Sequence, residues 1–402
     1  MNISTTKKNL AACSPDLRVD LLRGLANWFL FLDHVPHNVV NLLTLRNFGF
    51  SGATYVFVFV AGYAATVFFG NMAIERGFVV STTRIFRRTW QLYAAYIVLF
   101  VVYVDIIGNV AVQYATTDII DEYNVIGIVD HPMRTLMHGL ILQAKPLNLD
   151  TLQLFVVLMA VFPLLLWSML RRPNLTLAGS IALYAAARTF DWSLPAFPTG
   201  NWYFNPFCWQ LLSVLGAWFA VNGRKLTAIA HRLGALRIAA AVYLVFALAA
   251  TVAARVPSLA AIVPDFATEP FTPSDKENLA VYRIVHLLAL ALLFTYFVPR
   301  DWPALRSKWL QPVMKCGEEW LASFCIGVFL SFAGHFILIT GPNSVAMQIL
   351  VSVGGIATMT AIAYYISWSR QQDQKTGQAR KKTATANEPA VAGSLASNSL
   401  RE

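Results

Sequence analysis

Long, continuous apolar stretches recur along the whole chain and leave it few ways to fold. A helix of about 20 apolar residues spans the hydrocarbon core of a bilayer. Backbone polar groups in that core must be paired within the protein, so only helices and closed barrels cross it. Barrel strands alternate apolar and polar residues, whereas these stretches are apolar throughout, so the sequence predicts an all-α polytopic membrane protein with about ten transmembrane helices. The expected helices lie near residues 20–41, 50–70, 86–113, 151–170, 174–190, 205–222, 237–255, 279–298, 318–340 and 344–368.

The distribution of basic residues predicts the orientation of these helices. Only 13% of the residues are charged and the mean hydropathy is +0.54, too apolar for the surface of a separate soluble domain. With the amino terminus in the cytoplasm, 24 of the 31 Lys and Arg residues fall in inner segments. We therefore expect both termini to be cytoplasmic. The net charge of +10 follows from the same rule, so it does not indicate a nucleic-acid partner.

Three segments follow from this pattern. Residues 1–19 form a polar cytoplasmic segment without the apolar stretch of a cleavable signal peptide, and residues 20–370 form the membrane domain. Residues 371–402 are polar and of low complexity, so we expect a disordered cytoplasmic tail. The four cysteines show no metal-ligand spacing, so we expect free thiols and no metal site.

The first predicted helix carries a polar stripe. At about 100° per residue its polar side chains fall on one face, and such a face must contact protein or a wet cavity. Arg23 lies at the cytoplasmic end, and His34 lies eleven residues or about 16 Å further along, past the midplane. Pro36 is expected to kink the helix. The stripe comprises Asp20, Arg23, Asn27, His34, Asn38 and Asn41.

The stripe suits a long, thin ligand whose phosphate end binds Arg23 and whose reactive end reaches His34. Histidine is well suited to act as a general base near neutral pH. An interhelical hydrogen bond or a proton relay would also account for His34.

A second basic group lies at the start of the third predicted helix. Arg84, Arg87 and Arg88 share a face by helical spacing. Arginine binds phosphate through two parallel hydrogen bonds, so this group could hold the phosphates of the same ligand. The alternative is ordinary topogenic charge that pairs with lipid headgroups.

These motifs resemble those of a known group of membrane enzymes. The spacing from Arg23 to His34 resembles the first motif of the membrane acyltransferase-3 superfamily, and Arg84-x-x-Arg87 resembles its second. Longer stretches over helices one to nine resemble the OpgC family, with one departure at Gln153, where the family often has proline. These stretches are DLLRGLANWFLFLDHVPHN, FGFSGATYVFVFVAGY, LNLDTLQLFVVLMAVFP, NWYFNPFCWQLLSVLGAW and CGEEWLASFCIGVFLSFAGH.

The resemblance implies an acyl-CoA-dependent O-acyltransferase of the bacterial inner membrane. It implies transfer of a succinyl group from succinyl-CoA, entering from the cytoplasm, to a hydroxyl of an osmoregulated periplasmic glucan. Arg23, Arg84, Arg87 and Arg88 would bind the donor, and His34 would be the general base. Rival interpretations are an O-acetyltransferase acting on another envelope polysaccharide and a proton-coupled secondary transporter. The oligomeric state is left open, a homo-oligomer included.

Candidates for the acceptor side lie near the outer helix ends. Asp150, which the resemblance includes, could orient His34, bind a sugar hydroxyl or cap a helix. Arg283 is the best intramembrane cation for the donor carboxylate, with a structural ion pair as the alternative. Outer aromatic rings could stack on sugars or belong to the interfacial belt. The substrate candidates are Asn27, Asn38, Arg283, His286 and Trp202, with Trp192, Tyr203 and Trp209 nearby and with His131, His138 and His335 unassigned.

Overall fold

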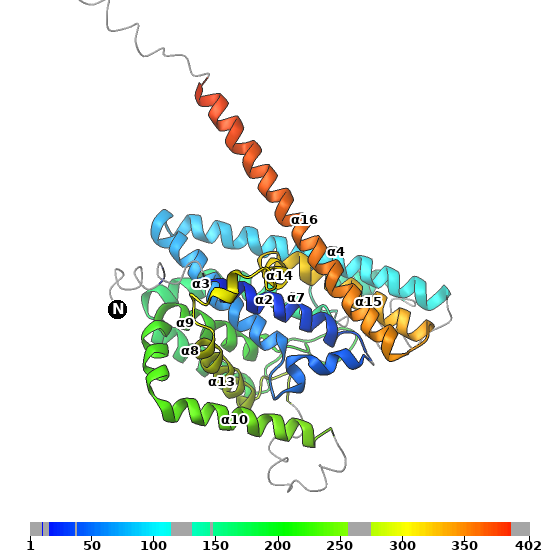
Figure 1. The fold of residues 1–402 in the computed structure, drawn as a ribbon, viewed down its shortest axis with the longest axis horizontal. Coiled ribbons are helices and arrows are strands. Elements are labelled where there is room, and N and C mark those ends of the chain that lie inside the picture. The colour runs from blue at the N-terminus through cyan, green and yellow to red at the C-terminus, as the bar shows by residue number, and fades with distance from the viewer. Residues whose placement is uncertain are drawn as a thin grey trace, which may run out of the picture.

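The computed structural model describes residue 10 and residues 16–36, 38–113, 131–144, 148–255 and 275–386. Within these ranges the chain is all-α, as predicted, with isolated β-bridges and no strand (Figure 1). A helix occupies each of the predicted stretches: α2 (Leu17–Asp33), α3 (Ala53–Arg76), α4 (Phe78–Gln113), α7 (Asp150–Arg171), α8 (Pro173–Thr189), α9 (Pro206–Arg232), α10 (Gly234–Ala253), α13 (Val281–Phe297), α15 (Trp320–Thr340) and α16 (Val345–Ala386). Short elements connect them: η1 (Val39–Leu43), η2 (Leu45–Asn47), α6 (Pro132–Leu140), η4 (Pro303–Arg306) and α14 (Gln311–Glu318).

Six of the described helices are long and apolar enough to cross a membrane, namely α3, α4, α7, α10, α15 and α16. The helix α13 is apolar but shorter. The chain is therefore an all-α membrane protein. The prediction of about ten spans depends on α2, α8, α9 and α13 and stays a prediction.

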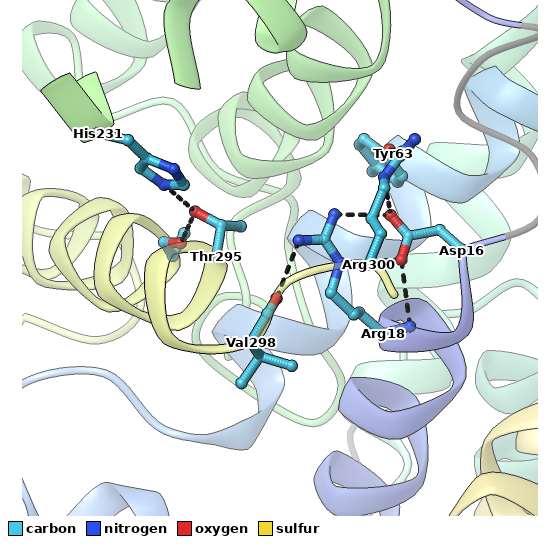
Figure 2. A network of polar contacts seen from close by, with 8 residues as sticks. Asp16, Arg18, Tyr63, His231, Thr295, Val298 and Arg300 are labelled. Atoms are coloured by element: carbon cyan, nitrogen blue, oxygen red, sulfur yellow. Dashed lines mark hydrogen bonds and ion pairs between the residues drawn. The ribbon is translucent and has the colours of Figure 1, made fainter. Parts of the chain in front are cut away.

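An ion-pair network fixes the start of α2. The side chain of Asp16 accepts a hydrogen bond from the backbone N–H of Arg18, so the helix begins at Leu17. Figure 2 shows the Asp16 carboxylate between the guanidinium groups of Arg18 and Arg300, at 2.8 and 3.0 Å. Arg300 also donates to the Tyr63 hydroxyl on α3 at 3.1 Å. Burial alone would raise the pKa of Asp16, but the two arginines outweigh it and hold that pKa below its ordinary value.

The other end of α2 differs from the prediction. The helix ends at Asp33 rather than near residue 41. Pro36 explains this, because proline has no N–H to donate and disfavours helical backbone in the residue before it. Asn38 and Asn41 lie beyond the resulting turn, and Asn38 is the N-cap of η1. The prediction of one continuous stripe is therefore wrong for Asn38 and Asn41, whereas His34 directly follows α2 as its C-cap.

Two other boundaries also differ from the predicted ones. The helix α4 begins at Phe78, so the group Arg84, Arg87 and Arg88 lies inside the helix rather than at its start. The helix α16 continues to Ala386 and projects away from the other helices (Figure 1), whereas disorder was predicted from residue 371. Its extension is rich in Gln, Lys, Arg and Ala, which favour helix even when fully polar. Residues 387–402 lie outside the described ranges.

Small residues bring the helices into close contact. A Cβ atom on Gly62 of α3 would lie 2.0 Å from the carbonyl oxygen of Ser213 on α9. A Cβ atom on Gly216 of α9 would lie 2.0 Å from the carbonyl oxygen of Phe59 on α3. The two backbones approach each other as in many membrane helix pairs, where small residues allow van der Waals contact without side chains between them.

The ion pairs divide the described chain into two ends. Each pair joins residues that the charge pattern assigns to the same side of the membrane. We name the inner end and the outer end after the predicted cytoplasmic and periplasmic sides. The inner pairs are Asp16 with Arg18 and Arg300, Lys315 with Glu318, and Arg370 with Glu319, and the outer pairs are Asp33 with Arg46 and Arg188 with Asp275.

The glycine contact between α3 and α9 predicts that alanine destabilises the protein more at Gly216 than at a glycine with open space around it. Gly216→Ala should destabilise the protein by about 1–3 kcal/mol, because the added methyl group forces the two backbones apart. Gly179→Ala is the matched control, since a Cβ atom there meets nothing within 4 Å. Thermal unfolding in detergent would measure both. Equal midpoints for the two variants would show that α3 and α9 do not touch at Gly216.

Candidate functional site

Two arginines from different helices meet at the inner end. Arg23 of α2 and Arg88 of α4 are half-buried, and their guanidinium groups lie close enough to repel each other, while Asp20 attracts Arg23. The Cζ atom of Arg88 lies 5.0 Å from the centroid of the Trp320 ring, at the start of α15. Two cations that repel each other favour the binding of an anion. We call Arg23 and Arg88 the inner arginine pair.

The predicted group on α4 does not converge on one site. Arg88 faces the protein, as does Ile85, which is fully buried. Arg84 and Arg87 are exposed on the surface of α4. Solvent or lipid headgroups can reach these two side chains, so their arrangement fits the topogenic alternative as well as it fits ligand binding.

The helix α16 contributes a third arginine to the inner end. Arg370 donates to Glu319 at 2.8 Å, and the Glu319 side chain is only 6% exposed. Both groups interact electrostatically with Arg88. Arg370 was not predicted as a site residue because it lies at the predicted boundary between the last span and the tail. The inner end is thus bounded by α2, α4, α15 and α16.

The interface of α2 with α15 contains buried polar atoms beyond the inner arginine pair. Asn27, one turn after Arg23, is 1% exposed and donates from Nδ2 to the carbonyl oxygen of Trp320 at 3.2 Å. Among the described residues, Oδ1 of Asn27 and Oγ of Ser323 have no hydrogen-bond partner. Burying such atoms unpaired is costly. A polar ligand that passes between α2 and α15 would therefore gain hydrogen bonds here.

His34 lies at the outer end of α2, where it is the C-cap. Its backbone N–H donates to the carbonyl groups of Leu30 and Phe31, and the residue is half-buried. The helix is unbroken from Arg23 to Asp33, so His34 stays about 16 Å from Arg23 along the axis. The helix therefore holds an arginine and a histidine a fixed length apart, one towards each end of the molecule.

Asp150 lies beside two tyrosines. It occupies the first turn of α7 but does not cap it, because the N-cap is Leu149. Its carboxylate interacts electrostatically with Tyr96 of α4 and with Tyr203. The Tyr96 side chain is fully buried, and its hydroxyl has no partner among the residues that the structure describes. The predicted contact between Asp150 and His34 stays a prediction.

Asn148 is a polar residue near this site that the sequence analysis missed. Its Nδ2 atom donates to the Tyr103 hydroxyl of α4 at 3.3 Å and to Ser331 Oγ of α15 at 3.4 Å. Its φ of 74° is left-handed, a conformation that asparagine tolerates better than most residues. An asparagine two residues before Asp150 was the available signal. Asn148 connects the start of α7 to α4 and α15.

Arg283 and His286 of α13 both bind the segment between η2 and α3. Arg283 is 6% exposed, and its Nη1 atom donates to the carbonyl oxygen of Phe50 and, at 3.3 Å, to the Tyr55 hydroxyl. His286 is fully buried, with Nδ1 2.6 Å from Ser51 Oγ. These contacts hold the segment in place and position the arginine below the outer surface.

The remaining substrate candidates differ in their hydrogen bonds and in how exposed their side chains are to a substrate. Asn38 accepts from the backbone N–H of Val40 and donates to Ser352 Oγ at 2.7 Å, which ties η1 to α16. Trp202 is 5% exposed, whereas Trp192 and Tyr203 are exposed. Of these aromatic candidates, Trp192 and Tyr203 are therefore the ones whose rings are open to a sugar.

A family model described as OpgC protein matches residues 15–371. The match begins one residue before the cap of α2 and ends within α16, so it includes all of the candidate residues above. No curated protein and no solved structure matches the chain.

The sequence-based expectation that CoA is the donor predicts different effects for two similar variants, because Arg88 is partly buried and Arg84 is exposed. Arg88→Gln should weaken binding roughly 10–100-fold, because it removes a charge-assisted contact at a partly buried site. Arg84→Gln, one turn earlier on the exposed face of α4, should leave the affinity nearly unchanged. Calorimetry of the purified protein with CoA measures both. Equal losses would move the phosphate site to the outside of α4.

Proposed function

The chain belongs to the OpgC family, which makes it a membrane acyltransferase of the glucan-modifying type, and on that premise we propose its reaction. A succinyl group passes from cytoplasmic succinyl-CoA to a hydroxyl group of a periplasmic glucan, in the bacterial inner membrane. The acyl-CoA donor, the succinyl group and the catalytic residue are parts of the proposal.

The inner arginine pair is the observation that carries this proposal. Arg23 and Arg88 are only partly exposed and repel each other, and an added anion would reduce this repulsion. Asp20 neighbours Arg23, and Glu319, which neighbours Arg88, is already paired with Arg370. CoA presents phosphates at one end and the thioester at the other. Its phosphates would bind the arginine pair, and its thin pantetheine arm would pass along α2 beside Asn27. The thioester would then reach His34.

His34 acts in this proposal as the general base for direct transfer. It removes the proton of the sugar hydroxyl while the hydroxyl oxygen attacks the thioester carbonyl carbon. The C–S bond then breaks, and the leaving sulfur of CoA takes the proton from the imidazolium. The products are a succinyl ester and CoA, and His34 is neutral again. Asp150, near Tyr96 and Tyr203, would bind the acceptor sugar or orient the histidine.

Arg283 provides the preference for a succinyl group. A succinyl donor carries a free carboxylate that must lose water on entering a buried site, so a cation should meet it there. Arg283 is 6% exposed and lies on α13 below the outer surface.

Loss of the general base gives the first test. His34→Ala should lower kcat about 10²–10⁴-fold while the protein still inserts and unfolds at the same temperature. His131→Ala, an exposed histidine without an assigned role, is the matched control and should keep its activity. The assay is the transfer of labelled succinyl from succinyl-CoA to a glucan by purified protein. A fully active His34→Ala variant would exclude His34 as the base. A wild-type protein indifferent to acyl-CoA would favour a transporter.

The second test concerns the choice of acyl group. Arg283→Gln should reduce kcat/KM for succinyl-CoA far more than for acetyl-CoA, because the acetyl group has no carboxylate to pair. A purely structural arginine would instead lower the thermal stability and both activities together. The ratio of the two kcat/KM values in wild type and variant decides between these outcomes. An unchanged ratio would favour the O-acetyltransferase alternative or another cation.

A further inference from the structure

Four basic side chains from separate segments come together at the outer end. Arg46 lies on η2, Arg255 follows α10, Lys276 lies in the turn before α13, and Arg283 lies on α13. Lys276 interacts electrostatically with Arg283, Arg46 and Arg255, so all four belong to one cluster. Only Arg283 was a candidate in the sequence analysis, because the cluster joins segments up to 237 positions apart in the chain, from 46 to 283.

Direct contacts hold this cluster around η2. The Nε atom of Arg46 lies 3.5 Å from Asp33 Oδ1, at the end of α2. Arg255 donates to Oδ1 of Asn47, the residue after Arg46. Arg283 donates to the carbonyl oxygen of Phe50, three residues further along. These contacts fix the three arginines to the short segment around η2, so their charges stay close together.

The cluster carries an excess of positive charge within the described ranges. Two carboxylates face its four cations: Asp33 interacts with Arg46, Lys276 and Arg255, and the exposed Glu277 follows Lys276 in the chain. Asp275, next to Lys276, is already paired with Arg188 at 2.7 Å. Partial burial of the ammonium group and then the neighbouring arginines lower the pKa of Lys276, as expected for cations that repel each other. An added anion would relieve this repulsion.

Three members of the cluster are open to solvent. Arg46, Arg255 and Lys276 are exposed, whereas Arg283 is buried. We call these three residues the outer basic patch. Arg46 contacts Asp33, the residue before His34, so the patch borders the proposed transfer site at the outer end.

We propose that the outer basic patch binds an anionic group, a phosphate or a carboxylate, carried by the acceptor glycan. The enzyme then selects an acceptor that is already negatively charged and places a neutral hydroxyl of it next to His34. This inference rests on the proposed function and adds the charge of the acceptor. Three exposed cations exceed what one acyl carboxylate requires, and the buried Arg283 already offers that carboxylate a partner.

The test compares two acceptors that differ only in charge, a neutral glucan oligosaccharide and the same oligosaccharide bearing one phosphate. With the full-length protein in nanodiscs, KM for the phosphorylated acceptor should be lower and should rise with salt, because exposed charges are screened. The triple variant Arg46→Gln, Arg255→Gln, Lys276→Gln should raise that KM roughly 10-fold and remove the salt dependence. KM for the neutral acceptor and for succinyl-CoA should not change.

Matched variants show whether the effect belongs to the patch. Arg134→Gln removes another exposed cation of the predicted outer side and should change neither KM. Lys276→Gln alone removes a side chain outside the contacts around η2, so it tests charge without disturbing them. Equal KM values for the two acceptors in wild type, or a triple variant that affects both acceptors alike, would overturn the proposal. A rise in KM for succinyl-CoA alone would assign the patch to the acyl group and would overturn it as well.

Direct binding separates this inference from the reaction itself. Microscale thermophoresis of the purified protein with the phosphorylated oligosaccharide needs no transfer to occur. Binding that the triple variant loses would support the patch even if no acyl group is transferred, in which case the proposed function alone fails. Transfer without any preference for the charged oligosaccharide would leave the proposed function standing and would exclude the patch as an acceptor site.

Discussion

The close packing of α2 against its neighbours is the constraint on which the rest of the structure depends. A helix with Asp20, Arg23 and Asn27 on it cannot face lipid, so other helices must enclose it. It contacts α3, α14, α15 and α16. Its contact with α14 leaves no room for side chains, since a Cβ atom on Gly24 would lie 1.9 Å from the carbonyl oxygen of Val313, and one on Gly317 would lie 1.8 Å from that of Asp20.

Because other helices enclose it, α2 acts as a rigid spacer between the inner end and the outer end, which differ in their chemistry. Arg23 meets Arg88 at the inner end, where an anion would bind. His34 caps the helix at the outer end, next to a turn that Pro36 enforces. The length between them is set by the helical rise and does not depend on flexible segments. A long donor with a charged head and a reactive tip matches this geometry, and a small ion does not need it.

Much of the fold could be predicted from the sequence, because the length of an apolar stretch depends only on neighbouring residues in the chain. Each predicted stretch contains a helix. The predicted helix boundaries were wrong at Pro36, where proline ends a helix that apolarity alone would continue. They were also wrong in α16, where polar residues favour helix beyond the membrane. The number of spans was less predictable, since α2 and α9 owe their place to their partners rather than to apolarity.

The site was predictable only where its residues share one helix. The spacing of Arg23 and His34 on α2 can be read from the chain, and the structure keeps it. Which arginine of α4 turns inward could not be read, because that depends on how α4 packs beside Trp320 of α15. Asn148 and the outer basic patch could not be predicted from the sequence either, because only tertiary contacts bring such distant segments together.

The central claim is that an acyl group crosses from a donor on one side to an acceptor on the other, and a sided transfer assay tests it most directly. The protein would be reconstituted into sealed vesicles with its carboxyl terminus outside, a glucan inside and labelled succinyl-CoA outside. Transfer across the membrane should give succinylated glucan in the lumen and free CoA outside. Labelled glucan that forms only when donor and acceptor share a compartment, or no succinyl ester at all, would contradict it.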